Sequence, residues 1–206
     1  MTETRFWWVR HAPVVDNGGL VYGGTEVDAD VREARLFRGL SMTLPTNAVF
    51  VASTLARTRQ TLQAVRAAGR ADIPSEPEQD ARLNEQHLGD WHGQPIAQMF
   101  PKGLPWPGFW MVQAEDLPPG GETFADVCRR VAASIHDLKA RHPGRDIVVA
   151  AHGGTIRAAL RLALDVTPAA ALAFSVDNCS ITRIDHIEGG ALGEAWRIGG
   201  VNIPPD

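Results

Sequence analysis

Apolar runs bounded by polar or glycine-rich segments recur along this chain and predict its strands. Three runs are short, continuous and rich in β-branched or aromatic residues, which is typical of strands buried on both faces. Two later runs alternate apolar and polar residues, with Gly189-Gly190 between them as a hairpin signal. The predicted strands are residues 5–9, 46–52, 146–151, 180–185 and 194–198, and 73–80 is a short strand or an extended connection.

Apolar positions with a period of 3.6 residues predict three helices. The first follows the second strand, with Ser53 or Thr54 as its N-cap and Gly69 as its stop. The second begins at 121–123 and ends at 142–144, and the third covers 156–164. Strands that alternate with helices predict a three-layer α/β/α sandwich. The final hairpin makes its mostly parallel sheet mixed.

A Pro- and Trp-rich stretch around 94–120 interrupts this regular pattern. Its central part, 101–119, holds five prolines together with Trp106, Phe109 and Trp110. We expect a lid or insertion there, with the aromatic residues packed on the rest of the protein. The length of 206 residues fits a single domain, 1–206, with a full core.

The charge balance of the chain argues against nucleic acid and anionic membranes as general binding partners. Lys plus Arg is 20 and Asp plus Glu is 24, so the formal net charge of −4 gives no general attraction to nucleic acid or to anionic membranes. Cys128 and Cys179 lie in no CxxC pattern, which predicts free buried thiols rather than a disulfide or a zinc site. No leader peptide or membrane-length apolar stretch is seen, so we expect a cytoplasmic protein, with monomer and homodimer both open.

Reactive polar residues follow each of the three buried strands. If these strands are parallel neighbours, their carboxyl ends meet in one crevice. A helix starting near Gly153 would add free N–H groups and the positive end of its dipole. In an acidic chain this local basic cluster is an anion site, and phosphate is its natural occupant. The residues concerned are Arg10, His11, Ser53, Arg57 and His152.

Phosphoryl transfer through histidine suits these residue types. A neutral imidazole is nucleophilic near pH 7, and arginines with a second histidine can surround the phosphoryl oxygens. Glu85 can protonate the leaving alkoxide and then deprotonate the attacking water, and the alternative for Glu85 is a loop carboxylate. His87 and His92 lack a third metal ligand at a useful spacing. Glu122 is interpreted as a first-turn carboxylate that favours a helix dipole.

Five segments, in order along the chain, resemble the motifs of the histidine phosphatase superfamily, the phosphoglycerate mutase-like proteins. They are Val9-Arg10-His11, 53–61, Leu83-Asn84-Glu85 with 89–93, 119–123 and 151–157. The resemblance spans most of the chain and implies the phosphoglycerate mutase-like fold. It also implies a phosphoenzyme mechanism with no metal and no organic cofactor.

The resemblance implies a role for each matched residue. His11 becomes the phosphorylated nucleophile, and Glu85 the proton donor. Arg10, Arg57 and His152 become the phosphate pocket, where the motif selects Arg57 rather than Arg59.

Substrate contacts are predicted at Asn17, Ser53 and Gly153. Asn17 stands where the mutases carry an asparagine. The loop 19–27 is similar to that of the α-ribazole phosphatase group, in which a Tyr-Gly pair precedes an acidic residue. The resemblance therefore favours a phosphomonoesterase that acts on a small phosphorylated metabolite.

The chain departs from the family pattern beside the expected nucleophile. Ala12 replaces the usual glycine, Pro13 and Val14 replace acidic and hydroxyl residues, and His92 replaces a glutamate. Proline has no N–H, so one phosphate donor is lost. Two alternatives therefore stay open beside a phosphatase: a phosphoglycerate mutase, and a phosphoester-binding regulatory domain without turnover.

Overall fold

The computed structural model describes residues 1–99, 113–190 and 193–205. Within these ranges six strands form one mixed sheet in the order β3-β2-β4-β1-β5-β6. The pairs β3–β2, β2–β4 and β4–β1 are parallel, whereas β5 runs antiparallel to both β1 and β6. The strands are β1 (Thr2–Arg10), β2 (Val49–Ala52), β3 (Glu78–Gln79), β4 (Asp146–Ala151), β5 (Ile181–Gly190) and β6 (Gly193–Ile203).

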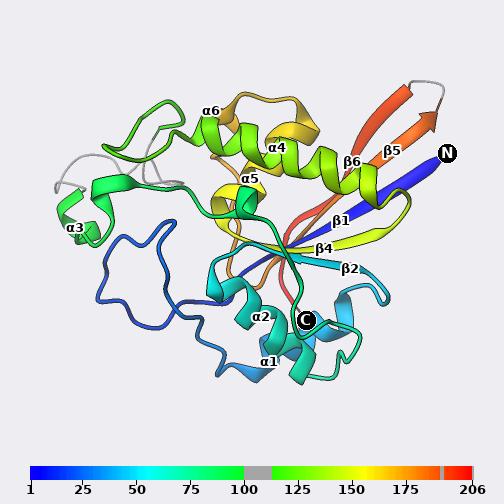
Figure 1. Ribbon diagram of the computed structural model, residues 1–206, viewed down its shortest axis with the longest axis horizontal. Helices are drawn as coiled ribbons and strands as arrows, with labels where there is room; N and C mark the ends of the chain where they lie inside the picture. Colours follow the sequence, from blue (N-terminus) through cyan, green and yellow to red (C-terminus); the bar gives the residue numbers. More distant parts are fainter. Residues whose placement is uncertain (100–112, 191–192, 206) are drawn as a thin grey trace.

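Helices cover both faces of this sheet (Figure 1). On one face lie α1 (Ala34–Thr43) and α2 (Ala56–Ala67), and on the other lie α4 (Phe124–Arg141) and α5 (Gly153–Leu164). Shorter elements complete the described chain. They are the 3₁₀ turns η1 (Ala81–Leu83) and η2 (Gly89–Trp91) and the single-turn helices α3 (Ile96–Met99) and α6 (Pro168–Ala171).

The central strand β4 shows how the sheet separates two cores. Ile147 and Val149 pack in the core under α4 and α5, whereas Val148 and Ala150 pack in the core with α1 and α2. All four side chains are fully buried. This alternation follows from the pleat, which sends successive side chains to opposite faces. The predicted three-layer sandwich with a mixed sheet is therefore confirmed.

The three predicted helices are present, and two of them, α2 and α5, start at other residues than expected. The helix α4 begins where expected, because Thr123 and Asp126 form a capping box at its N-terminus. The prediction that Ser53 or Thr54 caps α2 is wrong: the N-cap is Leu55, with no side-chain cap bond. Both hydroxyls have other partners, Ser53 on His152 and Thr54 on Asn84.

Other expectations were incomplete. The helix α5 begins at Gly153, three residues before the predicted start at Ile156. The helix α1 was not predicted, although Phe37 and Leu40 are buried at helical spacing. Cys128 and Cys179 are free and buried, and burial raises the pKa of their thiols to about 11 and about 12 respectively.

The central part of the expected lid, 101–119, falls mostly outside the described residues. Trp106, Phe109 and Trp110 all lie there, so their packing stays a prediction, and residues 113–119 are irregular. None of the helices in the described ranges is both long and apolar enough to cross a bilayer.

Two glycines allow the 87–90 and 119–122 segments to cross at backbone distance. The N–H of Asp90 donates to the carbonyl of Pro119 at 2.8 Å, and the N–H of Glu122 donates to the carbonyl of His87 at 2.9 Å. A Cβ at Gly89, where φ is +54°, would overlap the Pro119 carbonyl and lie 2.6 Å from the N of Gly121. A Cβ at Gly121 would overlap the His87 carbonyl. Glycine is therefore required at the crossing.

We expect Gly89→Ala to destabilise the fold by about 1–3 kcal/mol more than Gly93→Ala, since overpacking adds to backbone strain. Gly93 is the matched control, because its φ of +77° is also left-handed but nothing lies within 4 Å of a Cβ there. The measurement is the free energy of unfolding in urea. Equal losses for the two variants would contradict the close approach.

Candidate active site

The ends of three neighbouring parallel strands bring the predicted site residues together. In the register Arg10 pairs with Ala151, and Ala52 pairs with Ala150. The N–H of His11 donates to the Ala151 carbonyl at 3.0 Å, and the N–H of Ser53 donates to the Ala150 carbonyl at 3.2 Å. The residues that follow β1, β4 and β2 therefore start level with one another, as expected at the carboxyl edge of a parallel sheet.

A backbone carbonyl sets the tautomer of His11. Its Nδ1 lies 2.7 Å from the carbonyl oxygen of Ala12. A carbonyl only accepts, so Nδ1 carries the proton. In the neutral ring Nε2 then holds the free lone pair. The ring is 1% exposed, and its centroid lies 5.1 Å from that of His152.

Ser53 forms a hydrogen bond with the second histidine of the cluster, His152. Its hydroxyl lies 2.8 Å from Nε2 of His152 and accepts from the Leu55 N–H at 3.2 Å. Nδ1 of His152 is buried and has no hydrogen-bond partner among the described residues. If Ser53 donates to Nε2, the proton of the neutral ring lies on Nδ1, where it can be donated to an anion.

Two guanidinium groups add positive charge beside the histidines. Arg57 is fully buried and donates to the carbonyls of Gly23 and Thr25 at 2.7 and 2.8 Å. Arg10 donates to the carbonyl of Val176 at 2.5 Å. The Nε atoms of both arginines are buried without a partner in the described part of the chain. Buried donors in a cationic site are suited to an oxyanion, which would complete their hydrogen bonding.

Glu85 joins the site through the start of α5. Its carboxylate accepts from the N–H of Gly154 at 3.2 Å and from its own neighbour Gln86 at 3.0 Å. Asn84 fixes the segment on the other side, because its Oδ1 accepts from the N–H and the hydroxyl of Thr54, both at 2.9 Å. The Glu85 carboxylate therefore lies at the N-terminus of α5, the helix that begins directly after His152.

The electrostatics keep both histidines neutral at physiological pH. Burial, followed by the charges of Arg57 and Arg10, lowers the pKa of His11 well below its ordinary value. Burial also lowers the pKa of His152, with Arg57 the next cause and His11 the third. Burial lowers the pKa of the Arg57 guanidinium, and the nearby Glu85 carboxylate opposes that shift. The five predicted catalytic residues therefore act on one another as one cluster.

The remaining predicted residues are placed differently. Arg59 donates to the carbonyl of Thr54 and to Gln79, so Arg57 is the arginine that lies beside the histidines. Ser53 is fully buried and contacts His152, whereas Asn17 donates to Leu20 within its own loop. Gly153 is the first residue of α5. Direct substrate contacts for Asn17, Ser53 and Gly153 stay predictions.

Ala12 and Pro13, which depart from the family pattern, both form hydrogen bonds in the structure. Ala12 is fully buried, and its N–H donates to the hydroxyl of Thr61 at 2.8 Å. Pro13 is exposed, and its carbonyl accepts from Asp30. Within the described residues no group of three His, Cys, Asp or Glu side chains is placed to hold a metal ion.

Sequence reasoning missed a segment that braces the backbone at Arg10 and His11. Asn178 donates from Nδ2 to the carbonyl of His11 at 2.8 Å. Cys179, with a left-handed φ of +61°, donates its N–H to the Arg10 carbonyl at 3.0 Å, and the Ser180 carbonyl accepts from the Arg10 N–H at 3.2 Å. Local pattern carries no signal for this contact, because Asn178 lies 167 residues from His11.

The comparisons with known proteins agree with this geometry. The model of the histidine phosphatase superfamily (branch 1) matches residues 6–199. The chain belongs to this superfamily. A relative from Gloeobacter violaceus, named 2,3-bisphosphoglycerate-dependent phosphoglycerate mutase 2, is 30% identical over 151 residues, which cover 71% of this chain and 68% of the relative.

Solved structures of phosphatases share the histidine phosphatase fold seen here. The native mycobacterial glucosyl-3-phosphoglycerate phosphatase matches with a TM-score of 0.79 and 25% identity over 98% of this chain and 99% of that chain. A putative α-ribazole-5'-P phosphatase from Escherichia coli matches with a TM-score of 0.73 and 22% identity, covering 98% of each chain, which shows the fold alone.

Buried neutral histidines predict that this superfamily member loses stability in mild acid. The unfolded chain takes up a proton near pH 6.5, whereas folded His11 and His152 do so only at lower pH. The free energy of unfolding should therefore fall as pH falls through 6.5, by about 1.4 kcal/mol per pH unit for each such histidine. Urea unfolding between pH 7.5 and 5.5 measures this, and His11→Gln should reduce the slope.

The control is His136→Gln, which removes an exposed histidine from α4. If both variants change the slope equally, burial of His11 is not the cause.

The brace on His11 predicts a kinetic effect of Asn178. Asn178→Ala should lower kcat about fivefold with little change in KM, because one hydrogen bond of about 1 kcal/mol that orients His11 is lost. Asn178→Asp, of equal size, should also move the acidic limb of the kcat/KM profile to higher pH. Its carboxylate would favour the charged form of His11. Identical pH profiles for the Ala and Asp variants would contradict this placement.

Proposed function

We propose that the protein is a phosphomonoesterase that hydrolyses a small phosphorylated metabolite through a phosphohistidine at His11. The carrying observation is the 2.7 Å contact of Nδ1 with the Ala12 carbonyl, which leaves Nε2 as the free nucleophilic nitrogen. The family and the phosphatases that share its fold support this class of reaction.

The first half-reaction forms the phosphoenzyme. Nε2 of His11 forms a bond to phosphorus as the ester P–O bond breaks, and Glu85 gives its proton to the leaving alkoxide. Arg10, Arg57 and Nδ1 of His152 are the donors proposed to stabilise the charge on the phosphoryl oxygens.

The second half-reaction returns the enzyme to its starting state. Glu85, now a carboxylate, takes a proton from water as the water oxygen attacks phosphorus. The P–N bond breaks, inorganic phosphate leaves, and Nε2 regains its lone pair. One carboxyl group thus serves both steps, as microscopic reversibility of the proton transfer allows.

A phosphoglycerate mutase is the second candidate, because the Gloeobacter violaceus relative carries that name. The same His11 would be phosphorylated, but the phosphoryl group would pass to a second phosphoglycerate rather than to water. Interconversion of 2- and 3-phosphoglycerate that depends on a bisphosphate primer would support the mutase. Release of inorganic phosphate without a primer would support the phosphatase.

We expect His11→Asn to lower kcat/KM for p-nitrophenyl phosphate by about 10³-fold or more, since it removes the nucleophile itself. Rapid quenching in base, followed by ³¹P NMR of the denatured protein, should show a phosphohistidine in the unsubstituted enzyme and none in the variant. Full activity in His11→Asn would exclude the mechanism. A screen of phosphorylated metabolites, including α-ribazole phosphate and phosphoglycerates, then ranks substrates by kcat/KM.

A further inference from the structure

We propose that Arg130 and Glu122 form a clamp that positions Glu85 for proton transfer to the leaving group. The clamp is the ion pair between these two side chains together with its hydrogen bonds to the 82–87 segment. Neither residue was predicted to act in this way. The inference rests on the proposed function, in which Glu85 is the general acid.

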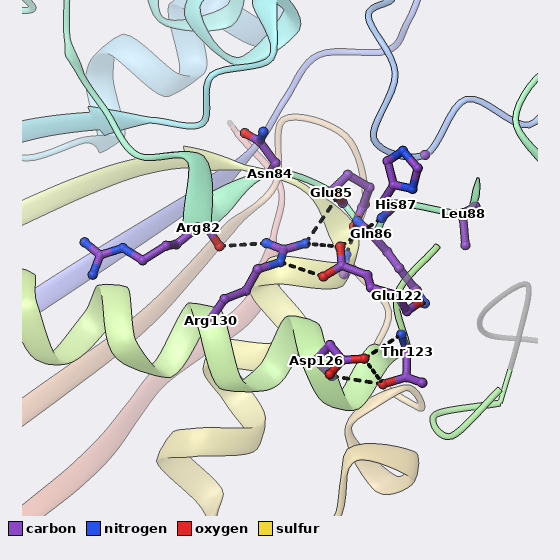
Figure 2. Close-up of polar contacts among 12 residues, drawn as sticks. Arg82, Asn84, Glu85, Gln86, His87, Leu88, Glu122, Thr123, Asp126 and Arg130 are labelled. Atoms are coloured by element: carbon purple, nitrogen blue, oxygen red, sulfur yellow. Dashed lines mark hydrogen bonds and ion pairs between the residues drawn. The ribbon is translucent and has the colours of Figure 1, made fainter. Parts of the chain in front are cut away.

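Arg130 of α4 holds two carbonyls of the segment that carries Glu85 (Figure 2). Its NH1 donates to the carbonyl of Arg82 at 2.6 Å, and its NH2 donates to the carbonyl of Glu85 itself at 3.3 Å. A guanidinium has donors in a fixed planar fork, so these two contacts define both the position and the orientation of the backbone between them.

Glu122 holds the same segment from its other end. Its Oε1 accepts from the N–H of His87 at 2.9 Å, and its own N–H donates to the His87 carbonyl at 2.9 Å. Its carbonyl accepts from the side-chain amide of Gln86 at 2.9 Å. Three consecutive residues, 85 to 87, are thus bound to either Arg130 or Glu122.

The two halves of the clamp are joined by a bidentate ion pair. Nε and NH2 of Arg130 donate to the two carboxylate oxygens of Glu122 at 3.0 and 2.7 Å, as Figure 2 shows. Both side chains are only 21–23% exposed, so solvent screens the pair less than a surface pair. Glu122 precedes Thr123, the N-cap of α4, so its interpretation as a first-turn carboxylate of that helix is wrong.

This arrangement matters because the Glu85 carboxylate has to reach a leaving oxygen within hydrogen-bond distance. Positioned acids contribute about 10²–10⁴-fold, and the contribution depends on the basicity of the leaving group. A poor leaving group, such as an alkoxide, needs the proton. A p-nitrophenolate leaves readily without it. Loss of the clamp should therefore slow alkyl phosphates selectively, whereas general damage to the fold would slow both substrates alike.

The experiment compares kcat/KM for p-nitrophenyl phosphate and for an alkyl phosphate turned over by the enzyme. Arg130→Met keeps an unbranched apolar stem but removes the fork and its charge. We expect a loss of about tenfold or more for the alkyl ester and less than about threefold for the aryl ester. Arg130→Lys keeps the charge without the fork and should fall between. Glu122→Ala should show the same selectivity as Arg130→Met.

The matched control is Arg129→Met on the same turn of α4. Arg129 pairs with Asp126, its side chain is 74% exposed, and its variant should leave both substrates unchanged. Circular dichroism and thermal unfolding of every variant distinguish a misfolded protein from a folded one in which Glu85 is displaced. If Arg130→Met does not fold, Arg130→Lys and Glu122→Ala carry the test.

Glu85→Gln distinguishes failure of the clamp from failure of the proposed function. A selective loss in Glu85→Gln with equal losses for both esters in Arg130→Met and Glu122→Ala would overturn the clamp alone. If Glu85→Gln itself shows no selectivity, Glu85 is not the general acid and the proposed mechanism fails at that step. A selective loss for the alkyl ester in all three variants, largest in Glu85→Gln, is the expected result.

Discussion

The site depends on the register of three parallel strands. Hydrogen bonds between β1, β4 and β2 place their carboxyl ends at one level, so that His11, Ser53 and His152 follow directly. A slip of one residue in either pairing would send each following side chain to the opposite face of the sheet. The fully buried, alternating side chains of β4 prevent such a slip, because they fill two cores at once.

A second constraint is the concentration of positive charge in a buried place. Burial opposes the charged form of Arg57, and the carbonyls of Gly23 and Thr25 compensate in part by accepting from its guanidinium. Burial, and then the charges of Arg57 and Arg10, lower the pKa of His11 as well and favour its neutral ring. Under the proposed function, the same charges would attract a phosphate ester, and the neutral ring of His11 would attack it.

Supporting contacts come from segments that are distant in sequence. Asn178 binds the carbonyl of His11, and the Glu122–Arg130 pair holds the backbone around Glu85. None of these residues belongs to the strand ends from which the site was first inferred. Close crossing of glycines at 89 and 121 brings two of the supporting segments within hydrogen-bond distance of each other.

The sequence by itself determined the order of the strands along the chain, the long helix α4 and the identity of the five clustered polar residues, whereas the strand bounds differ and Gly189-Gly190 ends β5. Local periodicity and short motifs carry that information, because each depends on neighbours within a few turns. Only the tertiary structure decided that Ser53 supports His152 rather than capping α2, and that Asn178 braces the backbone at His11. Those contacts join residues far apart in the chain, and a hydrogen bond across such a separation leaves no trace in local pattern.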